Sequence, residues 1–312
     1  MKVYTNIDDF RAKRSVVTVG TFDGVHLGHV KLLKKLQELK LQHNGCSVVV
    51  TFWPHPRTVV SPESHISLLN TLEEKAEILE NYGVDHLIII PFTRVFSMLS
   101  AKEFIEQYLV HKISAIQLVV GYDHRFGYDR IGDFFTLKQI LEPHKIGLEK
   151  VEAYTMHNKT ISSTKIRAAL DDGNIELASN YLGYDYFISV IVVVGNQIGR
   201  TIGFPTANMQ LKDSIKKLPQ DGVYATNVFY KGHKFNGMLN IGVRPTLKFQ
   251  KIMRTIEVNL FNFDEVIYGQ MLTIVLKHRV RREKKFEGLA ELKHQLHTDK
   301  QFILDMLEAG EL

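Results

Sequence analysis

Short runs of apolar, mostly β-branched residues recur through the first half of the chain. They lie at Val16–Val19, Ser47–Phe52, His86–Ile90 and Ile116–Val120, and each is almost continuously apolar. Strands with this pattern are buried on both faces, which is typical of a parallel sheet. We therefore expect these runs to form the centre of a parallel β-sheet.

Helical spacing separates these runs. Leucines recur three or four positions apart between the first two runs, and Thr71–Tyr82 has the same period behind a capping-box pattern of Thr71 and Glu74. Alternation of strand and helix predicts a doubly wound α/β fold for this half. The helical leucines are Leu32, Leu33, Leu36 and Leu39.

The second half of the chain has a different pattern. Two helical stretches, Thr164–Leu170 and Ile175–Leu182, precede strand-like runs separated by turn signals, and helical periodicity returns at Phe286–Leu307. Regularly spaced short strands predict an antiparallel barrel or sandwich. We therefore expect an α/β domain at residues 1–184 and a β domain with a C-terminal helix at residues 185–312. The expected strands are residues 186–194, 222–230, 234–241, 252–261 and 271–280.

Composition narrows the class of protein. The 312 residues are 45% hydrophobic and 23% charged, which is too well mixed for a disordered chain and long enough for two domains. Without an apolar run of membrane-spanning length or a signal peptide, we expect a cytoplasmic protein. The single cysteine, Cys46, argues against disulfide or thiolate-metal chemistry, and the net charge of +5 favours anionic ligands such as phosphates.

The segment Gly20–His29 is the first candidate site, because it joins a buried strand to the helix that follows. Its glycines let the backbone approach a ligand, and the free N–H groups of a new helix attract anions. His26 and His29 lie three positions apart, so both imidazoles can face one phosphate and stabilise charge on a departing pyrophosphate. A metal site or a helix cap is the alternative for this pair, but no cysteine or carboxylate in register completes a ligand set.

Two further segments belong to the same cleft. Gly121–Gly127 follows another parallel strand, so its polar groups emerge at the same sheet edge. Ile161–Arg167 opens a helix with hydroxyl groups and an arginine one turn in, although an ordinary N-cap also explains the hydroxyls.

Together with Phe52–Pro56, these segments resemble the nucleotidyltransferase module of the bifunctional prokaryotic FAD synthetases, the riboflavin kinase/FMN adenylyltransferases. The family motifs Gly-x-Phe-Asp-Gly-x-His-x-Gly-His, Phe-x-Pro-His-Pro, Gly-x-x-x-Arg-Phe-Gly and Ile-Ser-Ser-Thr-x-Ile-Arg occur here in order. The resemblance implies a Rossmann-like domain in which ATP phosphates lie on His26 and His29, Arg167 helps to clamp the triphosphate, and FMN lies near Asp123. FMN phosphate would attack the α-phosphorus and release pyrophosphate, which requires alignment rather than a protein nucleophile. The other implied ligand contacts are Ser162, Ser163 and Thr164 of the clamp, with Gly20, Thr21, Phe22, Asp23, Gly24, Gly28 and Arg125.

A second candidate site lies in the β domain. Thr206 and Asn208 are two positions apart, so in an extended chain they share a face and could offer two oxygen ligands to one Mg²⁺. Glu257 alternates with Ile256 and Val258, which sends its carboxylate to the opposite face of a strand. On spacing alone, the pair is equally a loop entering a strand, and the glutamate a solvated carboxylate.

The segments Gly199–Asn208, Asn240–Thr246 and Tyr268–Gly269 resemble the riboflavin kinase module, a small Greek-key β-barrel. The resemblance implies that Glu257 takes the proton of the riboflavin 5′-hydroxyl while that oxygen attacks the γ-phosphate. It also implies contacts of Thr206 and Asn208 with Mg-ATP, of Gly199, Arg200 and Phe204 with the nucleotide, and of Arg281, Glu283 and Phe286 with the flavin.

The chain departs from that family at three positions. Val190 and Val194 stand where a glycine and a flexible or polar residue are usual, and Asp185 stands where proline is common. We expect the Val190 side chain to hinder closure of the nucleotide loop and to weaken ATP binding by the kinase.

We therefore predict an enzyme that phosphorylates riboflavin to FMN in its C-terminal half and adenylylates FMN to FAD in its N-terminal half, with ATP and Mg²⁺ at both sites. One alternative is an FMN adenylyltransferase whose β domain only binds flavin. Another is an RNA-associated protein with a synthetase-like HIGH loop, but the chain has no Lys-Met-Ser-Lys-Ser-type loop and only a small charge excess. We expect small-molecule partners, without nucleic acid or membrane, and the sequence leaves the oligomeric state open.

Overall fold

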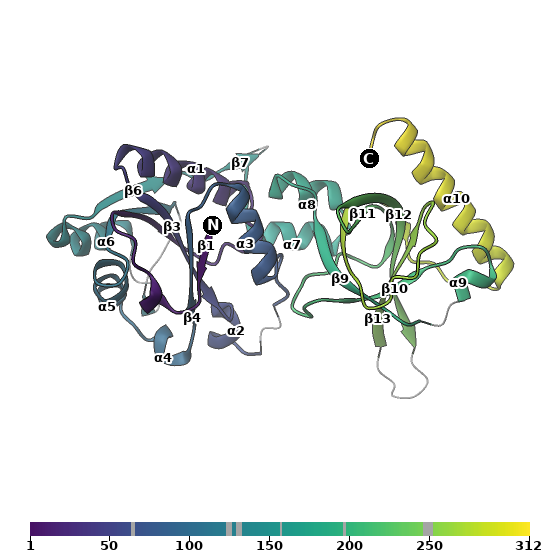
Figure 1. Cartoon of the computed structure of the whole chain (residues 1–312), viewed down its shortest axis with the longest axis horizontal. Helices are drawn as coiled ribbons and strands as arrows, with labels where there is room; N and C mark the ends of the chain where they lie inside the picture. Colours follow the sequence, from purple (N-terminus) through teal and green to yellow (C-terminus); the bar gives the residue numbers. More distant parts are fainter. Residues whose placement is uncertain (64–65, 123–126, 129–132, 157, 196–197, 246–251) are drawn as a thin grey trace. The chain divides into compact units, whose positions relative to one another are not determined.

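The computed structural model describes residues 1–63, 66–122, 127–128, 133–156, 158–195, 198–245 and 252–312. The chain divides into two compact units, Met1–Ser163 and Thr164–Leu312 (Figure 1). Among the helices in these ranges, none combines the length and the apolar character that crossing a bilayer requires. The sequence-based boundary between residues 184 and 185 stays a prediction.

A six-stranded sheet forms the centre of the first unit, and its order is β1-β4-β3-β2-β5-β6. All neighbouring strands pair in parallel, which confirms the predicted doubly wound fold. The strand order reverses between β2 and β5, so the loops that leave the carboxyl ends of these two strands flank a crevice. The strands are β1 (Lys2–Tyr4), β2 (Ser15–Val19), β3 (Cys46–Trp53), β4 (His86–Pro91), β5 (Ala115–Gly121) and β6 (Gly147–Val151).

Helices cover both faces of this sheet (Figure 1), which explains why every residue of β2 is buried. Helix α1 (Leu27–Gln42) packs on β2, β3 and β5 with the leucines expected from their spacing. Side chains of α5, η2 and α6 join the core on the other face. The remaining short elements and helices of the unit are η1 (Ile7–Asp9), α2 (Pro56–Val60), α3 (Leu72–Asn81), α4 (Arg94–Ser97), α5 (Ala101–Phe104), η2 (Ile105–Val110), α6 (Phe134–Leu141), η4 (Glu142–His144) and the hairpin β7 (Thr155–Met156) with β8 (Lys159–Thr160).

The predicted capping box at the start of α3 is confirmed. The Thr71 hydroxyl accepts the backbone N–H of Glu74 at 3.2 Å, and the Glu74 carboxylate accepts the N–H of Thr71 at 3.0 Å. Two backbone donors that would otherwise lack partners are satisfied inside the protein, which fixes where α3 begins.

The second unit is a closed antiparallel barrel with the order β10-β13-β12-β11-β14-β9. Strands β11, β12 and β13 follow one another, and β14 returns beside β11, which is Greek-key order. The expected barrel class is therefore confirmed. Its strands are β9 (Phe187–Val193), β10 (Ala207–Leu211), β11 (Gly222–Tyr230), β12 (His233–Pro245), β13 (Ile252–Leu260) and β14 (Met271–Arg282).

Within the described ranges, four helices accompany the barrel. They are α7 (Ser163–Asp171), whose first residue ends the first unit, α8 (Ile175–Leu182), α9 (Ile198–Thr201) and α10 (Leu289–Glu308). Helix α10 contacts β12 and β14, and its Ile303 completes a core with Val223, Met238 and Phe261. The C-terminal helix expected from the periodicity at Phe286–Leu307 is thus present and closes one side of the barrel (Figure 1).

The structure places Val190 in the core of the barrel. Along β9, Ile188, Val190 and Val192 are buried and alternate with partly exposed residues, so the Val190 side chain points into the barrel interior. It pairs across the sheet with Leu211 and Leu272. Val190 is therefore a core residue, and the weaker ATP binding expected from it stays a prediction. Val194, by contrast, is 74% exposed.

Candidate active sites

The loop after β2, residues 20–26, has an unusual backbone conformation, and we call it the β2 loop. Gly24 has φ +85°, which a glycine adopts without steric cost, but Phe22 and Val25 also have positive φ, at 47° and 35°. A β-branched residue in this region is strained and persists only where its surroundings impose the conformation. Backbone strain of this kind gathers at ligand-binding loops, and this loop lies at the sheet's switch point.

Hydrogen bonds from three directions hold the loop in this conformation. The carbonyl of Thr21 accepts the Lys75 ammonium at 2.7 Å and the Thr51 hydroxyl at 3.3 Å. The carboxylate of Asp23 accepts the backbone N–H of Leu69 at 2.9 Å. Asp23 and Lys75 are only 2% exposed, so these contacts are shielded from water. Asp23, predicted as a ligand contact, therefore also holds the loop in place.

The two predicted imidazoles lie together directly after this loop. The rings of His26 and His29 are stacked, with their centroids 3.8 Å apart and their planes 15° from parallel. His26 is the N-cap of α1, because its Nδ1 accepts the backbone N–H of His29 at 3.4 Å. The Phe22 ring lies 5.0 Å from the His29 ring and closes the stack on one side.

Burial keeps both imidazoles neutral. It lowers the pKa of His26 to about 4, against a smaller opposing effect of the Asp23 carboxylate. Burial also moves the pKa of His29 well below its usual value, and the charges of His26 and Lys75 act in the same direction. Since His26 Nδ1 accepts a hydrogen bond, its neutral ring carries the proton on Nε2. Within the part of the chain that the structure describes, the buried Nδ1 of His29 has no hydrogen-bond partner.

This arrangement suits an anion. A buried imidazole nitrogen without a partner is costly unless a ligand satisfies it. A phosphate group would supply acceptor oxygens, and its negative charge would raise the lowered pKa values of the two rings. The helix N-terminus adds partial positive charge at the same place.

The other residues predicted for this site fall into three groups. Ser163 donates its hydroxyl to the carbonyl of Asp23 at 2.8 Å, which ties the Ile161–Arg167 segment to the loop. Ser162 precedes it, while Thr164 and Arg167 lie on α7 in the second unit. The predictions at Asp123 and Arg125 lie outside the described residues. Gly20 and Gly28 lie against the rings of Phe22 and His26.

The second predicted site gathers on the outside of the barrel. Glu257 of β13 pairs with Asn208 of β10 on one side and with Asn240 of β12 on the other. Paired residues project from the same face of a sheet, so these three side chains form one row, which we call the Glu257 row. The hydroxyl of Thr206 donates to the Glu257 carboxylate at 3.2 Å. Ile256, at 4% exposed, faces the core, as the alternation predicted.

The loop before β10 packs closely on this row. A Cβ at Gly195 would come within 2.1 Å of the Asn208 side chain, so only glycine leaves room for it. The carbonyl of Pro205 accepts a hydrogen bond from the Asn259 amide at 2.6 Å, which fixes the chain just before Thr206. Gly199 lies in this loop, and the side chain of Arg200 lies outside the description.

Two predicted ligand contacts are engaged inside the protein. Phe204 is 4% exposed, and its ring meets the His297 ring edge to face at 4.8 Å. The guanidinium of Arg281 holds the buried carboxylate of Asp299 on α10 through three contacts of 2.8–3.0 Å. These contacts anchor the loop before β10 and the helix α10 to the barrel, and a direct role of either residue in binding stays a prediction.

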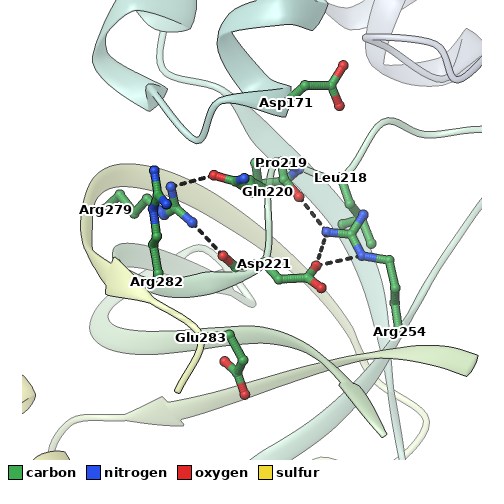
Figure 2. A pocket seen from close by; sticks show the side chains of 9 residues that line it. All are labelled: Asp171, Leu218, Pro219, Gln220, Asp221, Arg254, Arg279, Arg282 and Glu283. Carbon is green, nitrogen blue, oxygen red and sulfur yellow. Dashed lines mark hydrogen bonds and ion pairs between the residues drawn. The ribbon is translucent and has the colours of Figure 1, made fainter. Parts of the chain in front are cut away.

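A cavity of about 450 Å³ opens beside the barrel in the second unit (Figure 2). Arg254 is paired with Asp221, and Arg279 donates to the Gln220 side chain at 2.7 Å. Such a charged wall offers little apolar contact to a flavin ring, which favours aromatic and aliphatic surroundings. The lining residues are Asp171, Leu218, Pro219, Gln220, Asp221, Arg254, Arg279, Arg282 and Glu283, of which six are charged.

Two residues at these sites were given no role by the sequence-based prediction, although Asn240 is the first residue of the Asn240–Thr246 segment named there. Asn240 belongs to the Glu257 row only through strand register, which a single sequence does not reveal. Lys75 had a visible signal, because it falls three positions after Leu72 and four before Leu79, on the apolar face of a predicted helix.

Comparison with known proteins gives matches over both units. The family model for FAD synthetase matches residues 9–165, and the model for riboflavin kinase matches residues 182–307. The bifunctional riboflavin kinase/FMN adenylyltransferase of Bacillus subtilis (strain 168) is 40% identical over 290 residues, 92% of this chain and 91% of its own length. The enzyme of the same description from Escherichia coli (strain K12) is 38% identical over 295 residues, 94% of this chain and 93% of its own.

A solved structure is similar along the same length. A crystal structure described as a macrolide-efflux protein from Streptococcus pneumoniae matches with a TM-score of 0.88 and 31% identity, covering 96% of this chain and 97% of its own. The term macrolide efflux describes the Streptococcus pneumoniae protein and is not carried over to this chain. Since both family models match in order and the identity to the curated enzymes extends over nearly the whole chain, this protein belongs to the family of bifunctional riboflavin kinases/FMN adenylyltransferases.

Proposed function

We propose that the two family activities are carried out at the two sites described above, with the β2 loop transferring adenylate to FMN and the Glu257 row phosphorylating riboflavin. The adenylyltransferase assignment rests on one observation, the stacked neutral pair of His26 and His29 at the switch point. The kinase assignment rests on the convergence of Thr206, Asn208 and Glu257. Riboflavin and FMN are substrates of these reactions, and FMN and FAD are their products.

In the adenylyltransferase, an oxygen of the FMN phosphate attacks the α-phosphorus of ATP. The bond from that phosphorus to the bridging oxygen breaks, and pyrophosphate leaves with its electron pair. His26 donates from Nε2, and both rings take on positive character as bound phosphate raises their pKa values. Their task is therefore to stabilise the charge that accumulates on the leaving pyrophosphate. Ser162, Thr164 and Arg167 are proposed to complete the contacts with the triphosphate.

In the kinase, the riboflavin 5′-hydroxyl attacks the γ-phosphorus of ATP and ADP leaves. Glu257 accepts the proton of that hydroxyl, and its strand position holds the carboxylate in place for the transfer. The Thr206 hydroxyl, already bonded to Glu257, orients the carboxylate.

The oxygen-rich Glu257 row fits a magnesium ion, because hydroxyl, amide and carboxylate oxygens are the donors that Mg²⁺ prefers. Thr206 and Asn208 would hold it together with the ATP phosphates. When bound, the ion would neutralise charge that develops on the phosphate oxygens. We also propose Mg-ATP as the substrate of the first unit, and a cytoplasmic site of action.

Reciprocal variants test the assignment of each reaction to its site. Purified protein is given riboflavin or FMN with Mg-ATP, and FMN and FAD are separated by chromatography. We expect Glu257→Gln to slow riboflavin phosphorylation about 10²–10⁴-fold while FMN adenylylation stays near normal. We expect His29→Asn to slow adenylylation about 10²-fold or more and to spare phosphorylation. The exposed Glu265→Gln serves as the matched control for both reactions.

Parallel loss of both reactions in either variant would contradict two separate sites. Wild-type protein that converts FMN to FAD but leaves riboflavin unchanged would support the alternative in which the β domain only binds flavin.

A further inference from the structure

A lysine is buried beneath the β2 loop. Lys75 on α3 is 2% exposed, and the hydrogen bond that its ammonium makes to the described residues goes to the neutral carbonyl of Thr21, at 2.7 Å. Lysine is almost never buried to this extent unless it is paired. No carboxylate among the described residues lies within ion-pair distance of this ammonium, although the Asp23 charge acts on it from further away. The protein therefore keeps a buried cation whose partner is a loop carbonyl.

The carbonyl that Lys75 holds belongs to the strained part of the loop. Thr21 directly precedes Phe22, the first of the residues with positive φ. A conformation of this kind needs external contacts to persist, and Lys75 supplies the shortest of the two hydrogen bonds to Thr21. Removing the ammonium would leave this carbonyl with the longer bond from Thr51 and allow the loop to relax away from the shape that a phosphate would meet.

The charge of Lys75 also reaches the imidazoles. It is one of the causes that lower the pKa of His29. Burial lowers the pKa of Lys75 itself to about 8, so the side chain is mostly charged at neutral pH. Because both imidazoles are neutral, Lys75 contributes a positive charge that acts at the same place as their rings.

We infer that Lys75 is a positioning residue of the adenylyltransferase: it fixes the β2 loop through the Thr21 carbonyl and places a buried positive charge under the phosphates of ATP. The inference rests on the proposed function, because it takes the β2 loop to be the ATP phosphate site. Because Lys75 is only 2% exposed, its effect on the nucleotide is exerted through the conformation of the loop and through its positive charge, without direct contact.

Steady-state kinetics of Lys75→Met test the inference. We expect the KM for ATP in FMN adenylylation to rise about tenfold or more, while the KM for FMN changes less than about twofold. Riboflavin phosphorylation by the same preparation serves as an internal reference. A purely structural role would reduce the amount of active enzyme, which lowers kcat and leaves both KM values unchanged.

Lys40→Met provides a matched control in the same unit. Lys40 pairs with Asp85 at 2.7 Å, and Asp85 precedes β4, at the sheet edge opposite the β2 loop. The substitution removes an equally long cation and its partner contact without affecting the loop. We expect it to lower the stability of the first unit and to leave the KM for ATP unchanged.

The pH profile provides a second readout. The charged and titratable groups around Lys75 are Asp23, His26 and His29, with Glu74 as its neighbour on α3. Between pH 7 and pH 9.5 the lowered pKa values keep His26 and His29 neutral. We expect the wild-type KM for ATP to rise as Lys75 loses its proton around pH 8, and the KM of Lys75→Met to stay flat.

Specific outcomes would overturn the inference. It is wrong if Lys75→Met changes kcat alone, or if it raises the KM for ATP no more than Lys40→Met does. If the methionine variant does not fold by tryptophan fluorescence, Lys75→Gln, which keeps a donor for Thr21 without the charge, is judged by the same two criteria. Wild-type protein that makes no FAD would overturn the proposed function and the inference with it, whereas normal FAD synthesis by Lys75→Met would overturn the inference alone.

Discussion

The buried imidazole of His26 makes the first unit sensitive to acid. Its pKa is lowered to about 4 in the folded protein, whereas the same side chain titrates near 6.5 when it is exposed in an unfolded chain. Below pH 6.5 the unfolded chain therefore binds a proton that the folded unit does not bind until the pH nears 4. At about 1.4 kcal/mol per pKa unit, His26 lowers the free energy of unfolding by about 2 kcal/mol at pH 5 and by about 3 kcal/mol at pH 4.

The variant His26→Asn isolates this contribution, because asparagine keeps the N-cap of α1 but does not titrate. We expect the free energy of unfolding to fall about 2 kcal/mol less in the variant than in the wild type between pH 8 and pH 5. Trp53, the single tryptophan of the chain, ends β3 in the first unit, so its fluorescence in urea titrations follows that unit.

His111→Asn is the matched control, because His111 is exposed in the same unit. We expect its acid sensitivity to equal that of the wild type. The reasoning would be refuted if wild type and His26→Asn lost stability in parallel, to within about 0.5 kcal/mol, over this pH range.

Two further predictions concern the barrel. Val190→Gly should lower the free energy of unfolding of the second unit by about 3 kcal/mol, because it leaves a cavity in the core and a flexible residue in β9. Calorimetry measures this change. A glycine variant with unchanged stability and a lower KM for ATP in the kinase reaction would instead support a role of Val190 in closure of the loop before β10. Asp299→Asn should cost about 3 kcal/mol, because it leaves the Arg281 guanidinium without its buried partner. Glu291→Gln breaks an exposed ion pair with Lys284 and should leave the melting midpoint of the wild type unchanged. Equal shifts of the midpoint in Asp299→Asn and Glu291→Gln would contradict this account.

The fold was largely predictable because its central strands carry long apolar runs. The core strands β2, β3, β4 and β5 begin and end within one or two residues of their predicted limits. Strands with few buried residues have no apolar run in their sequence. Strand β1 has three residues, none of them buried, and β10 has a single buried residue. Edge and short strands form because a neighbour offers hydrogen bonds, which the sequence of the strand itself does not record.

The site was predictable where neighbouring residues in sequence act together. His26 and His29 are stacked because they lie one turn apart on α1, and Thr206 meets Glu257 only because β10 pairs with β13. The former contact follows from helical spacing, and the latter needed the family resemblance. The sequence alternation also predicts the orientation of Val190, since Val190 lies two positions from the apolar Ile188 and Val192 and shares their face of the strand. The expectation about the loop came from the glycine that is usual at this position in the family.

Closure of the barrel has a consequence for the kinase. Glu257 lies on a strand with hydrogen-bonded neighbours on both sides, so its backbone amide can exchange with solvent hydrogen only when the barrel opens broadly. The backbone that carries Glu257, the proposed base, is therefore as rigid as the most protected part of its unit. Substrate entry and release must then depend on movements of loops around a fixed carboxylate, and substitutions that merely weaken the barrel should lower the number of working molecules without changing how each one works.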